Sequence, residues 1–325
     1  MHAGLSGTMS AVAALLTASF AAVSAAQTSV PAPNVQAPAH DCVLIDTDVD
    51  IDDVMAIPMV LRHRRVAAVV TTEGTTTAAL GGSALARMLA APGVAQHIPV
   101  IVGASATADR SRAVPAWVAQ SRAAMERLNG LLAVPLPPTA ADRPFEEDVV
   151  QAVHNCRRIT ILAIGPWSSF ARYAPRIAHR IKAVVAQGRP LHSEAEGTKT
   201  TAFNCEYDLP SCEAAFQQIR RFHIQAIWVD TPLKATPAYV PTLDMVQELQ
   251  PDGLPGALRA VLMANQAIWN PDHLDPGFGE SFLWDQLASL YILHPALFHK
   301  VGAHMEPAAP PDEIRRIWTS DTNSH

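Results

Sequence analysis

Residues 42–53 read CVLIDTDVDIDD, an apolar run that leads directly into five aspartates within eight positions. Similar apolar runs alternate with helix-like segments along the chain. Strands are predicted at 42–45, 66–70, 98–102 and 159–164, and helices at 53–63, 78–91 and 146–155. Strands that are apolar throughout and alternate with helices indicate a parallel sheet that is covered on both faces. The prediction is one large α/β domain, residues 41–325, with a mainly parallel central sheet flanked by helices.

The aspartates after the first strand are the strongest functional signal: Asp46, Asp48, Asp50, Asp52 and Asp53. In open parallel sheets, ligands bind at the carboxyl ends of the strands, where this cluster is expected. So many carboxylates in one crevice repel one another unless some are protonated or a cation neutralises them. A set of oxygen ligands without His or Cys favours Ca²⁺ or Mg²⁺. The alternative is a solvated acidic loop.

Two other carboxylate motifs can be compared with this stretch. An EF-hand loop that starts at Asp46 needs Gly at its sixth position and Glu at its twelfth. Ile51 and Ile57 stand there, so that interpretation fails. A haloacid-dehalogenase-type phosphatase also opens with Asp-x-Asp after a strand, but it wants Thr or Val where Asp50 stands. Phosphatase chemistry is therefore a weak alternative.

Composition narrows the class of ligand. The 325 residues are 49% hydrophobic, too apolar for a disordered chain, and the formal net charge is −6. Nucleic-acid binders usually carry a basic surface, and anionic membranes attract basic proteins, so neither partner is expected. A small-molecule ligand is favoured.

The N-terminal residues have the pattern of a processing segment. Residues 11–26 form an uncharged apolar run that ends in small residues, as secretory signal peptides do. The run is shorter than the ~20 residues that span a bilayer. We expect a signal peptide at 1–26 and a Pro/Ala-rich linker at 27–40. The protein is then exported, periplasmic or secreted, with no membrane contact after signal cleavage.

The cysteines bear on the same question of compartment. An even number of cysteines in an oxidising compartment allows two disulfides, in any of three pairings, and buried free thiols are the alternative. The four residues are Cys42, Cys156, Cys205 and Cys212.

Several segments, in chain order, resemble the inosine–uridine nucleoside hydrolase family. The family opens with a strand and Asp-x-Asp-x-Gly-x-Asp-Asp, which Asp46, Asp48, Asp52 and Asp53 match. Its later motifs are similar to residues 69–74, 161–166, 202–204 and 284–285. The matches spread over nearly all of residues 42–300. The resemblance implies a nucleoside hydrolase-like fold with a Rossmann-like core.

The resemblance also implies a metal site and a sugar site. The implied Ca²⁺ ligands are Asp48, Asp53, Asp285 and the main-chain carbonyl of Ile164. Asp48 would also be the catalytic residue, the general base that removes a proton from the attacking water. Asp52 would hold the 2′-hydroxyl of the substrate, and Asn204 would grip the ribose.

The chain departs from the family in the sugar clamp. Thr75 stands where the family has Asn, and Ala202 where it has a sugar-binding Glu. A replacement carboxylate is available from Glu73, Glu194 or Glu196, and Glu196 is taken as the substrate-binding candidate. Residues 113–128 read AVPAWVAQSRAAMERL, and no His-Gly-x-Asp-Gly segment of the family is found.

Trp284 precedes Asp285, where several family members have His. A Trp is similar to the purine-preferring members, in which aromatic rings stack on the base, so we predict that Trp284 binds the base. Packing in the core is the alternative. Trp117 is a second stacking candidate. His192 and His273 are candidate leaving-group acids, or else solvated surface residues.

The leading hypothesis is Ca²⁺-dependent hydrolysis of the N-glycosidic bond of nucleosides to free base and ribose, with a preference for purines. Carboxylates near the sugar stabilise its oxocarbenium-like transition state. One alternative is a non-catalytic Ca²⁺-dependent nucleoside- or sugar-binding protein, and another is a hydrolase of a different ribosyl compound. Family members are often dimers or tetramers, so the resemblance is compatible with a homo-oligomer.

Overall fold

The computed structural model describes residues 40–90, 97–107, 119, 122–123, 126, 143–190, 194–195, 198–199, 202–232, 235–269 and 282–323. The signal peptide and the linker predicted at 1–40 lie outside these residues, except for His40, which begins the first strand. In the described part of the chain, no helix is both long and apolar enough to span a bilayer.

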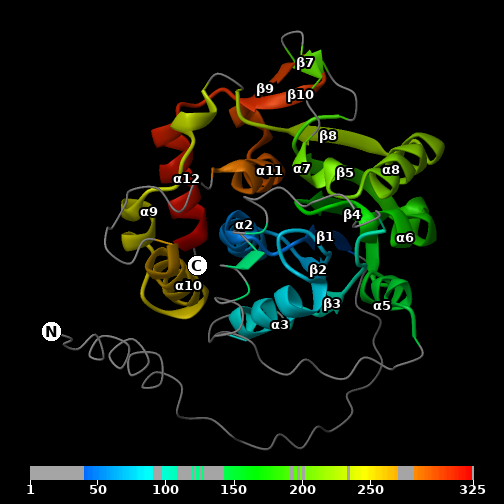
Figure 1. The fold of residues 1–325 in the computed structure, drawn as a ribbon, viewed down its shortest axis with the longest axis horizontal. Helices are drawn as coiled ribbons and strands as arrows, with labels where there is room; N and C mark the ends of the chain where they lie inside the picture. Colours follow the sequence, from blue (N-terminus) through cyan, green and yellow to red (C-terminus); the bar gives the residue numbers. More distant parts are fainter. Residues whose placement is uncertain are drawn as a thin grey trace, which may run out of the picture. The chain divides into compact units, whose positions relative to one another are not determined.

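A central sheet of eight strands organises the fold (Figure 1). Its order is β3-β2-β1-β4-β5-β8-β10-β9, and every neighbouring pair is parallel except β10 with β9. The strands are β1 (His40–Thr47), β2 (Val66–Thr71), β3 (Val100–Val102), β4 (Cys156–Ala163), β5 (Ile181–Gln187), β8 (Gln225–Val229), β9 (Phe298–Val301) and β10 (His304–Pro307). A separate antiparallel pair consists of β6 (Glu194–Ala195) and β7 (Thr198–Lys199).

Helices cover both faces of the sheet. They are α2 (Ile51–His63), α3 (Ala78–Leu89), α5 (Phe145–Ala152), α6 (Ser168–Ile177), α7 (Phe203–Glu206), α8 (Leu209–Arg221), α9 (Leu243–Gln247), α10 (Gly253–Trp269), α11 (Trp284–Leu293) and α12 (Pro311–Asn323), with 3₁₀ turns η1 (Ala178–Arg180), η2 (Thr236–Ala238) and η3 (Pro295–Leu297). Figure 1 shows α5, α6 and α8 on one side of the sheet and α2, α10, α11 and α12 on the other.

The core is correspondingly divided into two apolar clusters by strand alternation. Successive side chains of a strand point to opposite faces of the sheet. On β1, Val43 and Ile45 pack with α2 and α11, whereas Leu44 packs with α5 and α6. Burial on both faces explains why the strands are apolar throughout.

The predicted mainly parallel α/β architecture is confirmed. Each of the seven predicted elements is present, with its ends shifted by a few residues. The prediction did not extend beyond residue 164, and β5, β8 and the β9–β10 hairpin complete the sheet.

Both disulfides form, which settles the choice among the three pairings. Cys42 pairs with Cys156 and joins the amino-terminal halves of the neighbouring strands β1 and β4. Cys205 pairs with Cys212 and joins the short helix α7 to α8. None of the four cysteines is a free thiol.

Candidate active site

Three carboxylates meet where β1 ends and α2 begins. Asp52, Asp53 and Asp285 each bring a carboxylate oxygen within 4.8 Å of the other two. The first turn of α2 supplies two of these residues, and the first turn of α11, which packs on α2, supplies the third. Asp53 and Asp285 are buried and Asp52 is half-buried. The structure thus brings together residues that are 232 positions apart in the sequence (285 − 53).

Asp53 is fixed by the residues that start helix α2. The Thr47 hydroxyl donates a hydrogen bond to Asp53 Oδ1, and the Asp50 main-chain N–H donates to Asp53 Oδ2 at 3.0 Å. Asp50 is the N-cap, and its carboxylate accepts from the Ile51 N–H at 2.8 Å. This is a capping box, which satisfies the free N–H groups of the first helical turn. Asp50 replaces the Gly of the related motif and here has a structural role.

Asp48 lies just beyond β1 and is held by the turn that follows β2. The Thr75 N–H donates to Asp48 Oδ2 at 2.7 Å, and the Thr76 hydroxyl donates to the Asp48 carbonyl at 3.0 Å. A Cβ on Gly74 would lie 2.1 Å from Asp48 Oδ2, so only glycine allows this approach. In the sequence, Thr75 stands out only because the family has Asn at this position. The bond to Asp48 comes from the main-chain N–H of Thr75 and does not depend on the Thr75 side chain.

The backbone between Asp48 and the cap of α2 is strained. Val49 has φ of 57°, a left-handed conformation that a β-branched residue rarely adopts. Its side chain is buried against Gly81, and its N–H donates to the Thr47 hydroxyl at 3.0 Å. Strain of this kind persists where the surrounding contacts over-determine the backbone, and it is common at functional sites.

The electrostatics of the cluster fit a divalent cation. Burial, and then the charge of Asp50, raise the pKa of Asp48 to about 7. Burial first, and then neighbouring carboxylates, raise the pKa values of Asp52, Asp53 and Asp285 well above the usual range. Crowded buried carboxylates repel one another, and a cation would remove that cost. Because every donor is a hard oxygen, the set suits Ca²⁺ or Mg²⁺.

Ile164 and Asn204 lie together at the carboxyl end of β4. Asn204 Nδ2 donates to the Ile164 carbonyl at 3.1 Å and to Gln187 Oε1 at 3.2 Å. Both amide hydrogens are therefore engaged, which leaves Asn204 Oδ1 as the group that can accept a bond from a ligand. A Cβ on Gly165 would lie 2.6 Å from the Asp48 N atom, so this segment passes tightly against the end of β1.

Asp46 has a different environment from the other aspartates. Its Oδ1 accepts a hydrogen bond from the Thr72 hydroxyl at 2.5 Å, and burial raises its pKa to about 7. The Thr72 N–H also donates to the Thr47 carbonyl at 2.7 Å. Asp46 therefore links the ends of β1 and β2, and its carboxylate is not among those that meet at the start of α2 within the described residues.

An aromatic pair adjoins the acidic cluster. Trp284 is half-buried at the start of α11, immediately before Asp285, and its ring lies 4.8 Å from the ring of Phe282, centroid to centroid. Phe282 is a second aromatic neighbour that the sequence analysis missed. The sequence signal that could have identified Phe282 is its position two residues before Trp284.

The remaining predicted site residues are only partly described. Glu196, Trp117, His192 and His273 lie outside the described residues. Glu194 is described only as the first residue of β6. Glu73 is buried, and its carboxylate accepts hydrogen bonds from the Tyr207 hydroxyl at 3.1 Å and from the Ala106 N–H at 3.3 Å.

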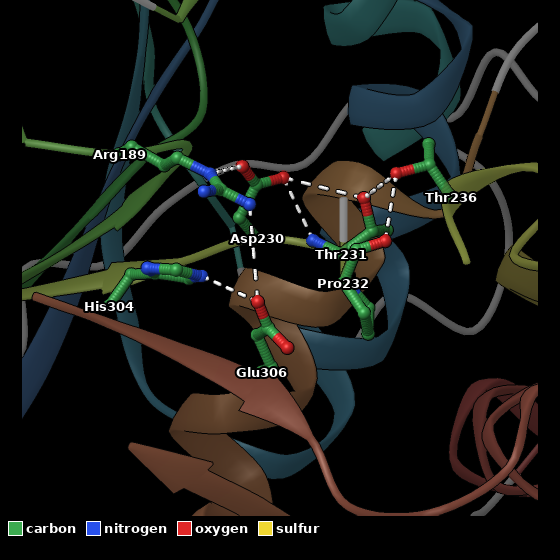
Figure 2. Close-up of polar contacts among 7 residues, drawn as sticks. All are labelled: Arg189, Asp230, Thr231, Pro232, Thr236, His304 and Glu306. Carbon is green, nitrogen blue, oxygen red and sulfur yellow. Dashed lines mark hydrogen bonds and ion pairs between the residues drawn. The ribbon is translucent and has the colours of Figure 1, made fainter. Parts of the chain in front are cut away.

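A second polar cluster lies at the ends of β5 and β8 and on β10 (Figure 2). Arg189 Nε lies 2.8 Å from Asp230 Oδ2, and its Nη2 lies 3.9 Å from Glu306 Oε1. His304 Nε2 lies 2.8 Å from the same Glu306 oxygen. These contacts join the strands β5, β8 and β10. Because the polar groups of the cluster contact one another, we assign the cluster no chemistry.

Residues 43–314 match the sequence model of the family described as inosine-uridine preferring nucleoside hydrolase. Among curated proteins, none matches the chain significantly.

Solved structures resemble the chain over most of its length. A purine-preferring ribonucleoside hydrolase from Gardnerella vaginalis is 15% identical, with a TM-score of 0.60, over 87% of this chain and 98% of that one. The inosine-uridine preferring nucleoside hydrolase of Bacillus anthracis is 16% identical, with a TM-score of 0.57, over 87% and 99%. A plant nucleoside hydrolase, PpNRh1, is 16% identical, with a TM-score of 0.62, over 89% and 100%. At these identities the likeness establishes the fold.

Proposed function

This chain belongs to the inosine-uridine preferring nucleoside hydrolase family and is a nucleoside N-glycosyl hydrolase. From that premise we propose that the hydrolysis depends on Ca²⁺ and favours purine nucleosides. The Ca²⁺ dependence is inferred from one observation: carboxylate oxygens of Asp52, Asp53 and Asp285 lie within 4.8 Å of one another. The purine part rests on the pair of Trp284 and Phe282 beside Asp285.

We assign the metal to the carboxylates at the start of α2 and α11. Asp53 and Asp285 are proposed ligands that meet there, and Asp52, which meets them, is close enough to join. Asp48 and the main-chain carbonyl of Ile164 are proposed as further ligands from the family resemblance; the Asp48 carboxylate is not among the three that meet. Ca²⁺ takes six to eight oxygen ligands, so water and sugar hydroxyls have room in the shell. When bound, the cation would neutralise the carboxylates and acidify the attacking water.

The proposed chemical steps use residues of the chain itself. Asp48 removes the proton of the water, and its carboxylate is oriented for this by the Thr75 N–H. Asp52 accepts a bond from the 2′-hydroxyl, and Asn204 Oδ1 accepts one from another ribose hydroxyl. Positive charge develops on the sugar as the N-glycosidic bond breaks and its electron pair leaves with the base, which takes up a proton on a ring nitrogen. The surrounding carboxylates stabilise this charge, and the deprotonated water forms the new bond to C1′ that gives free ribose.

The second candidate function is Ca²⁺-dependent binding of a nucleoside or sugar without turnover. Ala202 favours it, since the related enzymes carry a sugar-binding carboxylate at that position. A protein of this kind would bind the ligand saturably and release no product.

Release of reducing sugar from a panel of purine and pyrimidine nucleosides tests the proposal. We expect release with Ca²⁺, loss of release with a chelator, and recovery when Ca²⁺ is restored. Binding without release would favour the second candidate function. Release that a chelator leaves unchanged would contradict the Ca²⁺ dependence.

Trp284→Leu tests the purine preference. Stacking of a base on an aromatic ring contributes about 1–3 kcal/mol, so we expect kcat/KM for inosine to fall about tenfold relative to that for uridine. Tyr291→Leu is a matched control, because Tyr291 lies on the same helix and pairs instead with Phe298, with centroids 5.4 Å apart. An unchanged inosine-to-uridine ratio in Trp284→Leu would exclude Trp284 from base binding.

We also propose that the protein is exported. The disulfides Cys42–Cys156 and Cys205–Cys212 support this, because disulfides persist in oxidising compartments and are rare in the cytosol.

A further inference from the structure

We propose that Arg122 is a positioning residue that holds the Asp48 turn, residues 73–76, in the conformation required for hydrolysis. The inference rests on the proposed role of Asp48 as general base. Arg122 belongs to the stretch 113–128, in which the family's His-Gly-x-Asp-Gly segment is not found.

The guanidinium contacts two residues, Gly74 and Thr75, that also contact the Asp48 carboxylate. Arg122 Nε donates to the Thr75 carbonyl at 3.3 Å, and Nη2 donates to the Gly74 carbonyl. On the inner side of the turn, the Thr75 N–H donates to Asp48 Oδ2, and Gly74 packs directly against that carboxylate. The turn is therefore held between the Asp48 carboxylate and the Arg122 guanidinium.

The guanidinium also connects this turn to helix α7. Arg122 Nη2 donates to the Tyr207 hydroxyl at 2.6 Å, and that hydroxyl donates to Glu73 Oε1 at 3.1 Å. Tyr207 follows α7 directly and lies three residues after Asn204, the proposed ribose ligand. Arg122 and Tyr207 thus join the turn that orients the general base, Asp48, to the segment that is proposed to bind the ribose.

Physical chemistry favours Arg for this position. The turn has no regular secondary structure, so its conformation depends on individual hydrogen bonds. Bonds from a charged donor are stronger than neutral ones, and the planar guanidinium can serve several acceptors in fixed directions. Arg122 bonds to the Gly74 and Thr75 carbonyls, and the Thr75 N–H bonds to Asp48, so we assign Arg122 a role that it exerts through Asp48.

Arg122→Gly and Arg122→Lys test the inference. A misplacement of about 1 Å costs on the order of 100-fold in rate, so in Arg122→Gly we expect kcat to fall roughly 10- to 100-fold while KM changes less than about threefold. Added guanidinium ions should restore part of kcat. Arg122→Lys should restore little, since an ammonium cannot reproduce the fork of donors.

A second measurement does not depend on turnover. Amide hydrogen exchange of the peptide that contains residues 73–76 should be faster in Arg122→Gly, because the Thr75 N–H is released from Asp48 more often. Tyr207→Phe should give a smaller increase in exchange at the same amides.

Arg180→Gly is the matched control. Arg180 also donates to two main-chain carbonyls, of Val153 at 3.1 Å and His154 at 2.8 Å, in the loop before β4. Arg180→Gly should have the wild-type kcat and the wild-type rate of amide hydrogen exchange at residues 73–76. Added guanidinium ions should not change its kcat.

The outcomes separate the inference from the proposed function. Exchange of 73–76 in Arg122→Gly that equals the wild-type rate overturns the inference, whether or not the protein turns over nucleosides. An active wild type with an equally active Arg122→Gly also overturns it. An inactive wild type contradicts the proposed function, and faster exchange in Arg122→Gly would still support the structural role of Arg122.

Discussion

Replacing Asp48 with Asn should lower kcat by roughly 10³-fold, because general-base catalysis typically contributes about 10²–10⁴-fold and the same carboxylate is a proposed metal ligand. Asn has nearly the shape of Asp, and its carbonyl oxygen can still accept the Thr75 N–H, so the fold should be retained. Steady-state hydrolysis of inosine, with circular dichroism to verify folding, measures both effects.

Asp41→Asn provides the control for that experiment. Asp41 lies on the same strand, β1, near its opposite end, and it is an exposed partner of Arg157 at 3.0 Å. Its replacement should leave kcat unchanged, because exposed ion pairs contribute little. Wild-type turnover by Asp48→Asn would refute the assignment of Asp48 as the base.

Asp285→Asn should weaken Ca²⁺ binding by about 100-fold, and with it both activity and stability. Affinity in carboxylate sites depends on the number of charged ligands, and this change removes one of the three carboxylates that meet at the site. In the wild type, Ca²⁺ at 100 times its Kd should raise the free energy of unfolding by about 2.7 kcal/mol. The same Ca²⁺ concentration would only equal the Kd of the variant, so the variant should gain only about 0.4 kcal/mol.

Isothermal titration with Ca²⁺ and thermal unfolding with and without chelator measure these quantities. Mg²⁺ should stabilise the wild type less than Ca²⁺, because it requires stricter octahedral geometry and releases its waters reluctantly. Asp244→Asn is a suitable control, since that aspartate lies in the first turn of another helix, α9, and is exposed. Equal stabilisation of wild type and Asp285→Asn by Ca²⁺ would contradict the proposed ligand.

Much of the fold could be predicted because its signals are local. A buried parallel strand is apolar along its whole length, so β1, β2, β3 and β4 are visible in the sequence. The aspartates after β1 are also local, and the rule that ligands collect at the carboxyl ends of strands predicts where they lie.

Residues that contribute through the backbone or across long distances could not be predicted in this way. The main-chain N–H of Thr75 and the missing side chain of Gly74 orient Asp48, and neither contribution depends on a recognisable side chain. Arg122 acts through contacts with residues of other segments, namely its bonds to the Gly74 carbonyl and the Tyr207 hydroxyl.

The sequence by itself thus determined the parallel α/β architecture, the acidic cluster and the family, because strand burial and a run of carboxylates are properties of consecutive residues. Only the tertiary structure decided which carboxylates meet. Asp46 bonds to Thr72, whereas Asp52 and Asp53 join Asp285 from the far end of the chain. The physical reason is that the packing of α11 on α2 sets these distances, and no spacing within the sequence encodes it.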